Sequence, residues 1–258
     1  MIKKHLLAAA LGACITLSAP LSAWANPLKS LFLGADEGLA AVKSDIIGSD
    51  ARFDVLNSGV LNAAQGTPSL AQLQQYDSVL YWTNYSPADA VGLGNLLADY
   101  VDHGGIVVRA TFIGQEVPNL GRITSAGYAP FTTGRWDAYD SACLGVSTNH
   151  AIMAGVNTLC SPYYRGDWQA NLAPGAQLLA SWDDGRAFVG INANQNVIDI
   201  SLFPNVAMYG HATGDYRTLF ANALAFGSST GGNQVPEPAG LALVMLALGG
   251  VGLLRRRR

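Results

Sequence analysis

The fold of this chain is decided by the stretch SPADAVGLGNLLADYVDHGGIVV, residues 86–108. Its large apolar side chains recur at the spacing of one helix face, and they are Leu93, Leu96, Leu97, Tyr100 and Val101. Ser86 can cap this helix, Pro87 suits its first position, and Gly104 ends it. The apolar run that follows, residues 106–108, is typical of a parallel strand buried on both faces. A helix that leads directly into such a strand predicts an α/β protein.

Apolar runs bounded by turn residues continue this pattern on both sides of the stretch. We expect strands over residues 28–33, 53–56, 78–82, 106–108, 176–182, 187–192 and 197–203. We expect further helices over residues 69–75 and 215–226, the last one ended by Gly227. Hairpin turns are predicted at Asp183-Asp184-Gly185 and Asn194-Gln195-Asn196. Residues 114–172 show little periodicity, which indicates a functional loop region or an insertion.

The N-terminus carries the signal of an exported protein. Lys3 and Lys4 precede an apolar run over residues 6–17, and Ala23-Trp24-Ala25 supplies the small residues of a signal peptidase site. We therefore expect residues 1–25 to be a signal peptide that is cleaved after Ala25.

The C-terminus has three parts in a fixed order. Val235-Pro236-Glu237-Pro238 comes first, the uncharged residues 239–254 follow, and Arg255-Arg256-Arg257-Arg258 ends the chain. Together, residues 235–258 resemble the PEP-CTERM sorting signal of bacteria that make exopolysaccharide. The resemblance implies that an exosortase recognises and cleaves this tail. Residues 228–234, rich in Gly, Ser and Thr, predict a flexible linker before it.

The apolar part of this tail is short for a membrane anchor. It has sixteen residues, and a spanning helix normally takes about 20. A short helix can hold by thinning the bilayer, and the four arginines should stay in the cytoplasm. We expect an isolated hydrophobic helix that anchors the protein transiently in the inner membrane. After cleavage the protein would reach the cell surface or the extracellular matrix.

The two signals hide the charge of the remaining chain. The whole sequence has 15 basic and 18 acidic residues and a net charge of −3. Loss of Lys3, Lys4 and the four terminal arginines leaves 9 basic residues, and loss of Glu237 leaves 17 acidic ones. The mature protein is then near −8. We expect no nucleic-acid partner, because phosphate binding needs clustered basic side chains.

Two cysteines remain after the signal peptide, with Cys14, is removed. Cys143 and Cys160 in an exported protein favour a disulfide, which would contribute ~3 kcal/mol by closing its loop. Two buried thiols or a nucleophilic cysteine are the alternatives. The sequence has no CxxC motif and no Cys/His cluster, so it predicts neither a metal site nor a cofactor.

Five segments of the chain resemble the class I glutamine amidotransferase-like superfamily, in the branch that includes ThuA-like proteins. They are LFLGAD (31–36), YDSVL (76–80), LADYVDHGG (97–105), HAIMAGV (150–156), which is similar to the branch's HPIM-GV, and GDYRTLFANAL (214–224). They span most of residues 28–226, and we expect one domain over residues 26–227. The resemblance implies a flavodoxin-like three-layer α/β sandwich with a mainly parallel sheet and an antiparallel β extension.

The catalytic cysteine that the resemblance implies is missing. Enzymatic members carry it at a sharp turn after the fourth strand, with a histidine and an acid after a later strand. Residues 107–114 contain no cysteine and neither a GxCxG nor a GxSxG motif. Thr111 is the one hydroxyl candidate near that position, and the alternative is an ordinary β-branched strand residue. His211 and Asp215 could serve as base and orienting acid. Alternatively, Asp215 caps the last helix and His211 is a surface loop residue.

Acidic and aromatic side chains form a second group of candidates. Asp36 and Glu37 follow the first strand, at the edge where open α/β sheets bind ligands. They could accept sugar hydroxyls or hold a cation, or they could simply be solvated turn residues. Aromatic residues between 82 and 168 could stack on sugar rings, with Trp136 and Trp168 as the main candidates. The alternative is an aromatic core under a long loop.

Three classes of function remain open. The first is a non-catalytic exported domain that binds a ligand or partner, such as exopolysaccharide, in the extracellular matrix. The absent nucleophile and the acidic charge favour it. The second is a divergent hydrolase or transferase that uses Thr111, His211 and an acid. The third is a purely structural matrix protein. Expected partners are signal peptidase, exosortase and the matrix components.

Overall fold

The computed structural model describes residues 26–112, 121–132 and 135–230. The expected signal peptide, residues 1–25, and the expected sorting signal, residues 235–258, lie outside the described residues, as do residues 231–234 of the expected linker. Within the described part of the chain, no helix is both long enough and apolar enough to cross a membrane.

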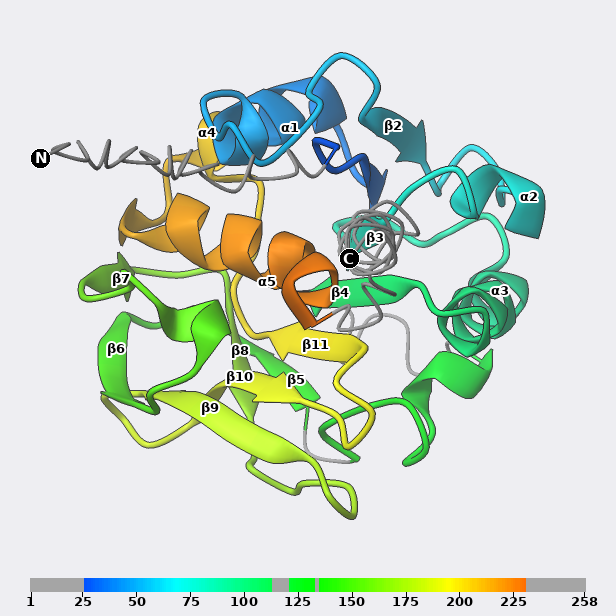
Figure 1. Cartoon of the computed structure of the whole chain (residues 1–258). Helices are drawn as coiled ribbons and strands as arrows, with labels where there is room; N and C mark the ends of the chain where they lie inside the picture. The colour runs from blue at the N-terminus through cyan, green and yellow to red at the C-terminus, as the bar shows by residue number, and fades with distance from the viewer. Residues whose placement is uncertain (1–25, 113–120, 133–134, 231–258) are drawn as a thin grey trace, which may run out of the picture.

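One ten-stranded mixed sheet forms the centre of the protein (Figure 1). Its parallel part has the spatial order β2 (Gly59–Asn62), β1 (Ser30–Ala35), β3 (Ser78–Thr83), β4 (Ile106–Ala110) and β11 (Val197–Ile200). The antiparallel part continues with β10 (Ala187–Ile191), β9 (Gln177–Trp182), β6 (Ala142–Ser147), β7 (Leu159–Ser161) and β12 (Thr213–Gly214). A separate two-stranded sheet pairs β5 (Arg135–Ala138) with β8 (Arg165–Trp168).

Helices cover both faces of the parallel strands. One face carries α1 (Leu39–Ile47) and α5 (Tyr216–Thr230), with η2 (Ala151–Met153) and α4 (Val206–Tyr209) beside them. The other face carries α2 (Leu70–Leu73), α3 (Ala90–Asp102) and η1 (Gly121–Thr124). This arrangement confirms the expected three-layer sandwich with an antiparallel extension.

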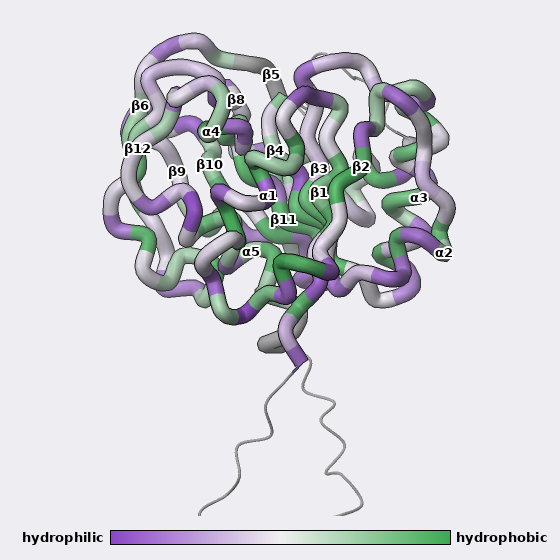
Figure 2. Tube along the Cα trace, turned by 90° about the horizontal axis from the view of Figure 1, so that it is seen from above, coloured by the Kyte–Doolittle hydropathy of each residue, from purple (hydrophilic) through white to green (hydrophobic). Residues whose placement is uncertain are grey.

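Strand residues alternate between the two cores. Phe32 and Trp82 pack on the side of α1 and α5, whereas Leu31 and Tyr81 pack on the side of α3. Neighbouring strand residues point to opposite faces, so a strand covered by helices on both sides must be apolar throughout. Figure 2 shows these apolar strands in the middle of the molecule.

The start of the chain differs from the expectation in two places. The second strand is β2, residues 59–62, and not residues 53–56, where only Phe53 makes an isolated bridge to Leu28. Residues 54–58 instead form a turn closed by Asp54, whose carboxylate accepts from Asn57. Helix α1 was not predicted, although its buried Leu39, Val42, Ile46 and Ile47 recur at helical spacing.

Two helix boundaries also differ. Asp89, and not Ser86, caps α3, because its carboxylate accepts from the backbone N–H of Gly92. Gly104 follows the end of α3 with a φ of 90°, as expected. Gly227 does not end α5, which continues to Thr230. A Cβ at Gly227 would lie 2.2 Å from the side chain of Ile106, so this glycine lets α5 approach β4 closely.

Candidate functional site

Polar and aromatic side chains gather at the carboxyl ends of the parallel strands. Asp36 follows β1, Asn84 and Tyr85 follow β3, and Asn205 and Tyr209 come after β11. Ligands of open α/β sheets bind at this edge, because loops from neighbouring strands meet there.

Asp36 is the centre of this arrangement. It is fully buried, and its carboxylate accepts from Trp82 Nε1 at 2.9 Å, Asn84 Nδ2 at 2.9 Å and Asn205 Nδ2 at 2.8 Å. All three donors are neutral, so they fix the carboxylate without cancelling its charge. Glu37 beside it is exposed, and the hydroxyl of Tyr85 lies 3.4 Å from Glu37 Oε1.

Five tyrosines are linked to this acidic pair through side-chain contacts, and we call them the tyrosine cluster: Tyr85, Tyr139, Tyr163, Tyr164 and Tyr209. The ring of Tyr164 lies 4.6 Å from that of Tyr163, 6.1 Å from that of Tyr139 and 5.8 Å from that of Tyr209. Tyr209 joins the Asp36 network because its hydroxyl accepts from Asn84 Nδ2 at 3.1 Å. Tyr85, Tyr139 and Tyr163 are 47%, 64% and 38% exposed, so the cluster has rings open to solvent.

The expected catalytic group is not assembled. Thr111 is fully buried, and its hydroxyl has no hydrogen-bond partner among the described residues. Asp215 instead accepts from the backbone N–H groups of Thr158 and Asn157 at 2.8 and 2.9 Å. These donors, Thr158 first, hold the pKa of Asp215 below its usual range.

His211 is buried rather than a surface loop residue. Its Nε2 lies 2.8 Å from the carbonyl oxygen of Phe203, which can only accept, so Nε2 carries the proton. Its Nδ1 has no hydrogen-bond partner within the described residues. Burial lowers the pKa of His211, although the Phe203 carbonyl opposes this shift. The ring packs against Tyr164 at 5.4 Å, which places a neutral imidazole behind the tyrosine cluster.

Of the two tryptophan candidates, Trp168 does not belong to this surface. Trp168 is fully buried and packs against Phe131 with 6.0 Å between ring centroids, so it belongs to the core. Trp136 lies on β5, opposite Asp167 of β8, and its side chain is outside the described residues. A short strand between two irregular segments gives no periodicity from which burial could be predicted.

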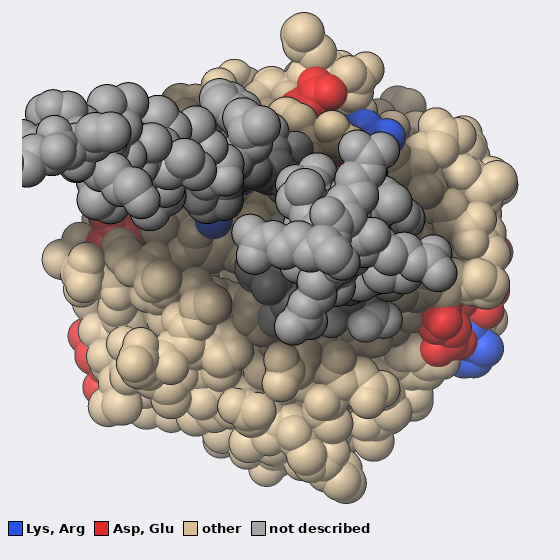
Figure 3. All heavy atoms as spheres, in the orientation of Figure 1, with Lys and Arg blue, Asp and Glu red and all other residues tan. Residues whose placement is uncertain are grey.

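Sequence reasoning also missed two networks of charged side chains. Arg109 and Asp199 are both fully buried and form a bidentate pair at 2.7 and 2.6 Å across β4 and β11. Arg165 and Arg186 pair with three carboxylates, which are Asp140 and Asp167 of the irregular region and Asp184 of the turn between β9 and β10. These arginines bind carboxylates of the protein itself. Elsewhere, charged side chains are scattered over the face seen in Figure 3.

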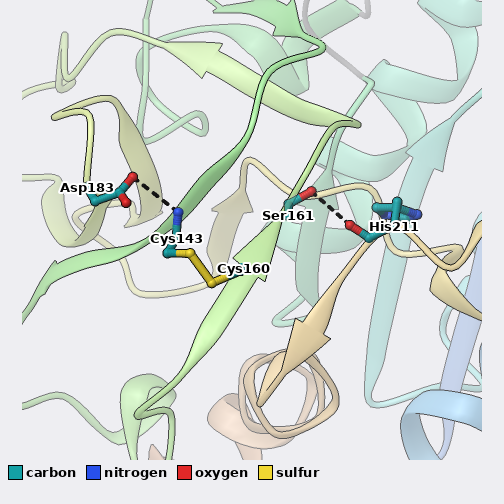
Figure 4. The surroundings of a disulfide bond; sticks show 5 residues. All are labelled: Cys143, Cys160, Ser161, Asp183 and His211. Atoms are coloured by element: carbon teal, nitrogen blue, oxygen red, sulfur yellow. Dashed lines mark hydrogen bonds between the residues drawn. A yellow bond between two sulfur atoms is a disulfide. The ribbon is translucent and has the colours of Figure 1, made fainter.

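The predicted disulfide between Cys143 and Cys160 is confirmed. It joins β6 to β7, where the two cysteines are direct cross-strand partners (Figure 4). Next to it, the hydroxyl of Ser161 donates to the carbonyl oxygen of His211 at 3.3 Å and also to that of Tyr163. The disulfide therefore holds the strand that leads directly into Tyr163 and Tyr164.

The hollows among the described residues lie elsewhere. Two of about 460 Å³ each are at the amino ends of the strands, and both are lined by Tyr76. Polar groups there bond within the protein: the Tyr100 hydroxyl donates to the carbonyl oxygen of Tyr76, and His103 Nδ1 lies 2.7 Å from that of Asp99. Exposed aromatic rings define the candidate site, and they are those of Tyr85, Tyr139 and Tyr163. Across the described residues, no three His, Cys, Asp or Glu side chains are grouped to hold a metal ion.

Comparison with known proteins gives a match in structure alone. No protein-family model and no curated protein sequence matches the chain. A ThuA-like protein from Bacteroides uniformis superposes with a TM-score of 0.56 at 14% identity, over 80% of this chain and 93% of that one. A glutamine amidotransferase from Thermotoga maritima superposes with a TM-score of 0.50 at 10% identity, over 79% of this chain and 99% of that one. At such identities the likeness shows the fold alone, and this chain has the fold of the glutamine amidotransferase-like and ThuA-like structures.

Proposed function

We propose that this protein is exported to the cell surface or the extracellular matrix, where it binds exopolysaccharide through the tyrosine cluster without catalysing a reaction on it. The observation that carries this proposal is the tyrosine cluster itself, which has three solvent-open rings and reaches the acidic pair Asp36 and Glu37 through Tyr85 and Tyr209. Flat rings stack on the apolar faces of sugars, and fixed polar groups beside them orient the hydroxyls.

The site chemistry supports binding rather than turnover. A nucleophile must be exposed and linked to a base, yet Thr111 is buried and its hydroxyl does not bond to His211. Asp36 already accepts three N–H donors, which suits a fixed electrostatic element better than a proton carrier.

Affinity electrophoresis tests the binding proposal directly. The purified protein should migrate more slowly in gels that contain the bound polysaccharide, and Tyr139→Ala and Tyr163→Ala should restore free migration. Tyr128→Ala is the matched control, because its hydroxyl bonds to Asp102 on the α3 side of the sheet. Unchanged retardation in both cluster variants would refute the tyrosine cluster as the binding surface.

A divergent hydrolase remains the second candidate, because the buried His211 keeps an unpaired Nδ1 and a lowered pKa. Release of reducing ends from the same polysaccharides distinguishes the two. Turnover that His211→Ala abolishes would replace the binding proposal with the enzymatic one. If the protein neither binds nor cleaves, it is a structural matrix protein.

Export has its own test in the bacterium that makes this protein. Deletion of residues 235–258 should abolish exosortase-dependent processing, because it removes the VPEP motif, the apolar helix and the arginines together. Replacement of the four arginines by serine is the smaller, matched change. Processing that continues after the full deletion would overturn the sorting proposal.

A further inference from the structure

The acidic end of the tyrosine cluster has an unbalanced negative charge. Asp36 is buried among neutral donors, and Glu37 is exposed next to it. Among the described residues, every observed ion pair involves other carboxylates, so neither Asp36 nor Glu37 has a cation in contact. A ligand that brings a positive charge would supply what this end lacks.

A second, independent feature is the side chain of Asn205, which is fully buried. Its Nδ2 donates to Asp36 at 2.8 Å and to the carbonyl oxygen of Glu37 at 3.0 Å, which fixes the amide between the two acids. Its Oδ1 has no hydrogen-bond partner among the described residues. Such an orphaned acceptor is uncommon in proteins and is satisfied when a donor arrives. This buried, unpaired acceptor belongs to the amide that is hydrogen-bonded to Asp36 and Glu37, whose carboxylates are acceptors as well.

Two aromatic rings stand beside these acceptors. Tyr85 reaches Glu37, whose charge is the main cause of the raised pKa of that tyrosine. Tyr209 is close enough that Asp36 and Glu37 add to the effect of burial in raising its pKa. Ring faces attract cations, and an ammonium group has three donors and no acceptor. The hydroxyls of a neutral sugar both donate and accept, so they match a site made of acceptors less well than an ammonium group does. An acidic sugar would be repelled by the two carboxylates.

We infer that the polymer bound at the tyrosine cluster carries free amino groups, and that the Glu37 end of the cluster takes the protonated amine of an amino sugar. This inference rests on the proposed function and adds the charge class of its ligand. Tyr139, Tyr163 and Tyr164 then stack on neighbouring sugars of the same chain, while Glu37 and Tyr85 contact the ammonium group.

Two oligosaccharides of equal length test the inference: chitosan hexamer carries free amines, and in its fully N-acetylated form each amine is a neutral acetamide. The Glu37 variant separates the effect of the charge from that of the acetyl groups. Calorimetric titration of the purified protein at pH 6 should give roughly tenfold tighter binding of the chitosan hexamer. Glu37→Gln should remove this difference, since it deletes the charge and keeps the shape. Asp50→Asn should retain it, because Asp50 pairs with Arg52 away from the cluster and loses the same unit of charge.

The outcomes separate the inference from the proposed function. If both hexamers bind equally, or if Glu37→Gln keeps the preference, the inference fails while binding through the tyrosines stands. If neither hexamer nor any neutral or acidic polysaccharide binds, the proposed function fails and the inference with it. A hexalysine peptide is the control for charge alone. If hexalysine binds as tightly as the chitosan hexamer and its binding depends on Glu37, the ligand is a basic protein rather than an amino sugar, and the inference fails.

Discussion

Two buried carboxylates of this protein are held in opposite ways. Asp199 lies within the sheet and receives both arms of the Arg109 guanidinium, which also donates to the carbonyl oxygen of Ile123. Asp36 lies at the carboxyl edge of the same sheet and receives only indole and amide N–H groups. The first arrangement neutralises a charge inside the protein. The second fixes a charge and leaves it to act on whatever approaches the edge.

The kind of donor that holds a buried carboxylate distinguishes a structural residue from a candidate binding residue more clearly than its burial does. Both carboxylates are fully buried, so exposure alone would place both in the core. A buried ion pair is complete in itself, and breaking it leaves a charge that the interior cannot solvate. A carboxylate held by neutral dipoles at an edge, with exposed rings beside it, is a typical binding element. The following changes test the comparison, starting with the largest expected effect.

Loss of the Arg109 guanidinium should be the most destabilising change. Arg109→Met leaves the Asp199 charge in the sheet without its cation and should lower the free energy of unfolding by roughly 3–5 kcal/mol. Chemical denaturation measures this directly. Arg109→Met combined with Asp199→Leu should recover most of the loss, because apolar side chains of similar size then fill the space. If Arg109→Met alone is as stable as the wild type, the pair does not have the structural role given to it.

Removal of the disulfide should have the next largest effect on stability. It acts on strands β6 and β7, far along the sheet from the Arg109–Asp199 pair of β4 and β11. Cys143→Ser with Cys160→Ser should lower the free energy of unfolding by ~3 kcal/mol, because the unfolded chain gains freedom. Sugar binding should weaken as well, since β7 leads into Tyr163 and Tyr164. The oxidised mature protein should be lighter than its reduced form by the mass of two hydrogens. Two free thiols in the native exported protein would show that the disulfide does not form there.

Asp36→Asn should lower the free energy of unfolding by about 2 kcal/mol. The NH2 group of the new amide cannot accept a hydrogen bond, so at least one of the N–H groups around it loses its acceptor. Glu37→Gln is the matched change at the neighbouring, exposed position and should stay within about 0.5 kcal/mol of wild type. Thermal or chemical unfolding of the two variants side by side checks both values. If the two variants lose equal stability, Asp36 does not have the special position that the comparison gives it.

The pH dependence of stability should show the smallest effect, through His211. Burial lowers the pKa of this residue in the folded state, so the unfolded chain binds more protons below about pH 6.5. Stability should therefore be constant above that pH and decrease as the pH falls through 6.5. His150, whose pKa burial also lowers, contributes in the same direction. His211→Gln should flatten the slope between pH 5 and 7, and an unchanged slope would contradict a neutral buried imidazole.

Much of the fold could be predicted because its signals are local. The strand over residues 106–108 and the helix before it follow from apolar spacing and a terminal glycine, and both are present as β4 and α3. Helix α1 had a comparable signal in Leu39, Val42 and Ile46, but it was not predicted, and no capping side chain marks its start, where Gly38 has a φ of 64°. The short strands β5 to β8 could not be predicted, since strands of three to six residues between irregular segments have no measurable period.

The candidate site could be predicted only in part. Asp36 and Glu37 stood out because they follow the first strand, and the structure places them where that position implies. Asn205 and Tyr209 gave no signal, because nothing in their local sequence relates them to β1. Trp168 looked like a surface aromatic beside polar neighbours, yet it lies on β8 with its side chain in the core, against Phe131.

The sequence by itself determined the alternation of helices and strands, the one possible partner for each of the two cysteines in residues 26–227, and the expectation of export from the two ends. Tertiary structure alone decided that Asp36, Asn84 and Asn205 meet, and that five tyrosines spread over residues 85–209 form one surface. The physical reason is that periodicity and turn chemistry act over a few neighbouring residues. Which strands become neighbours depends on how the whole chain buries its apolar surface, and that order sets which polar side chains share an edge.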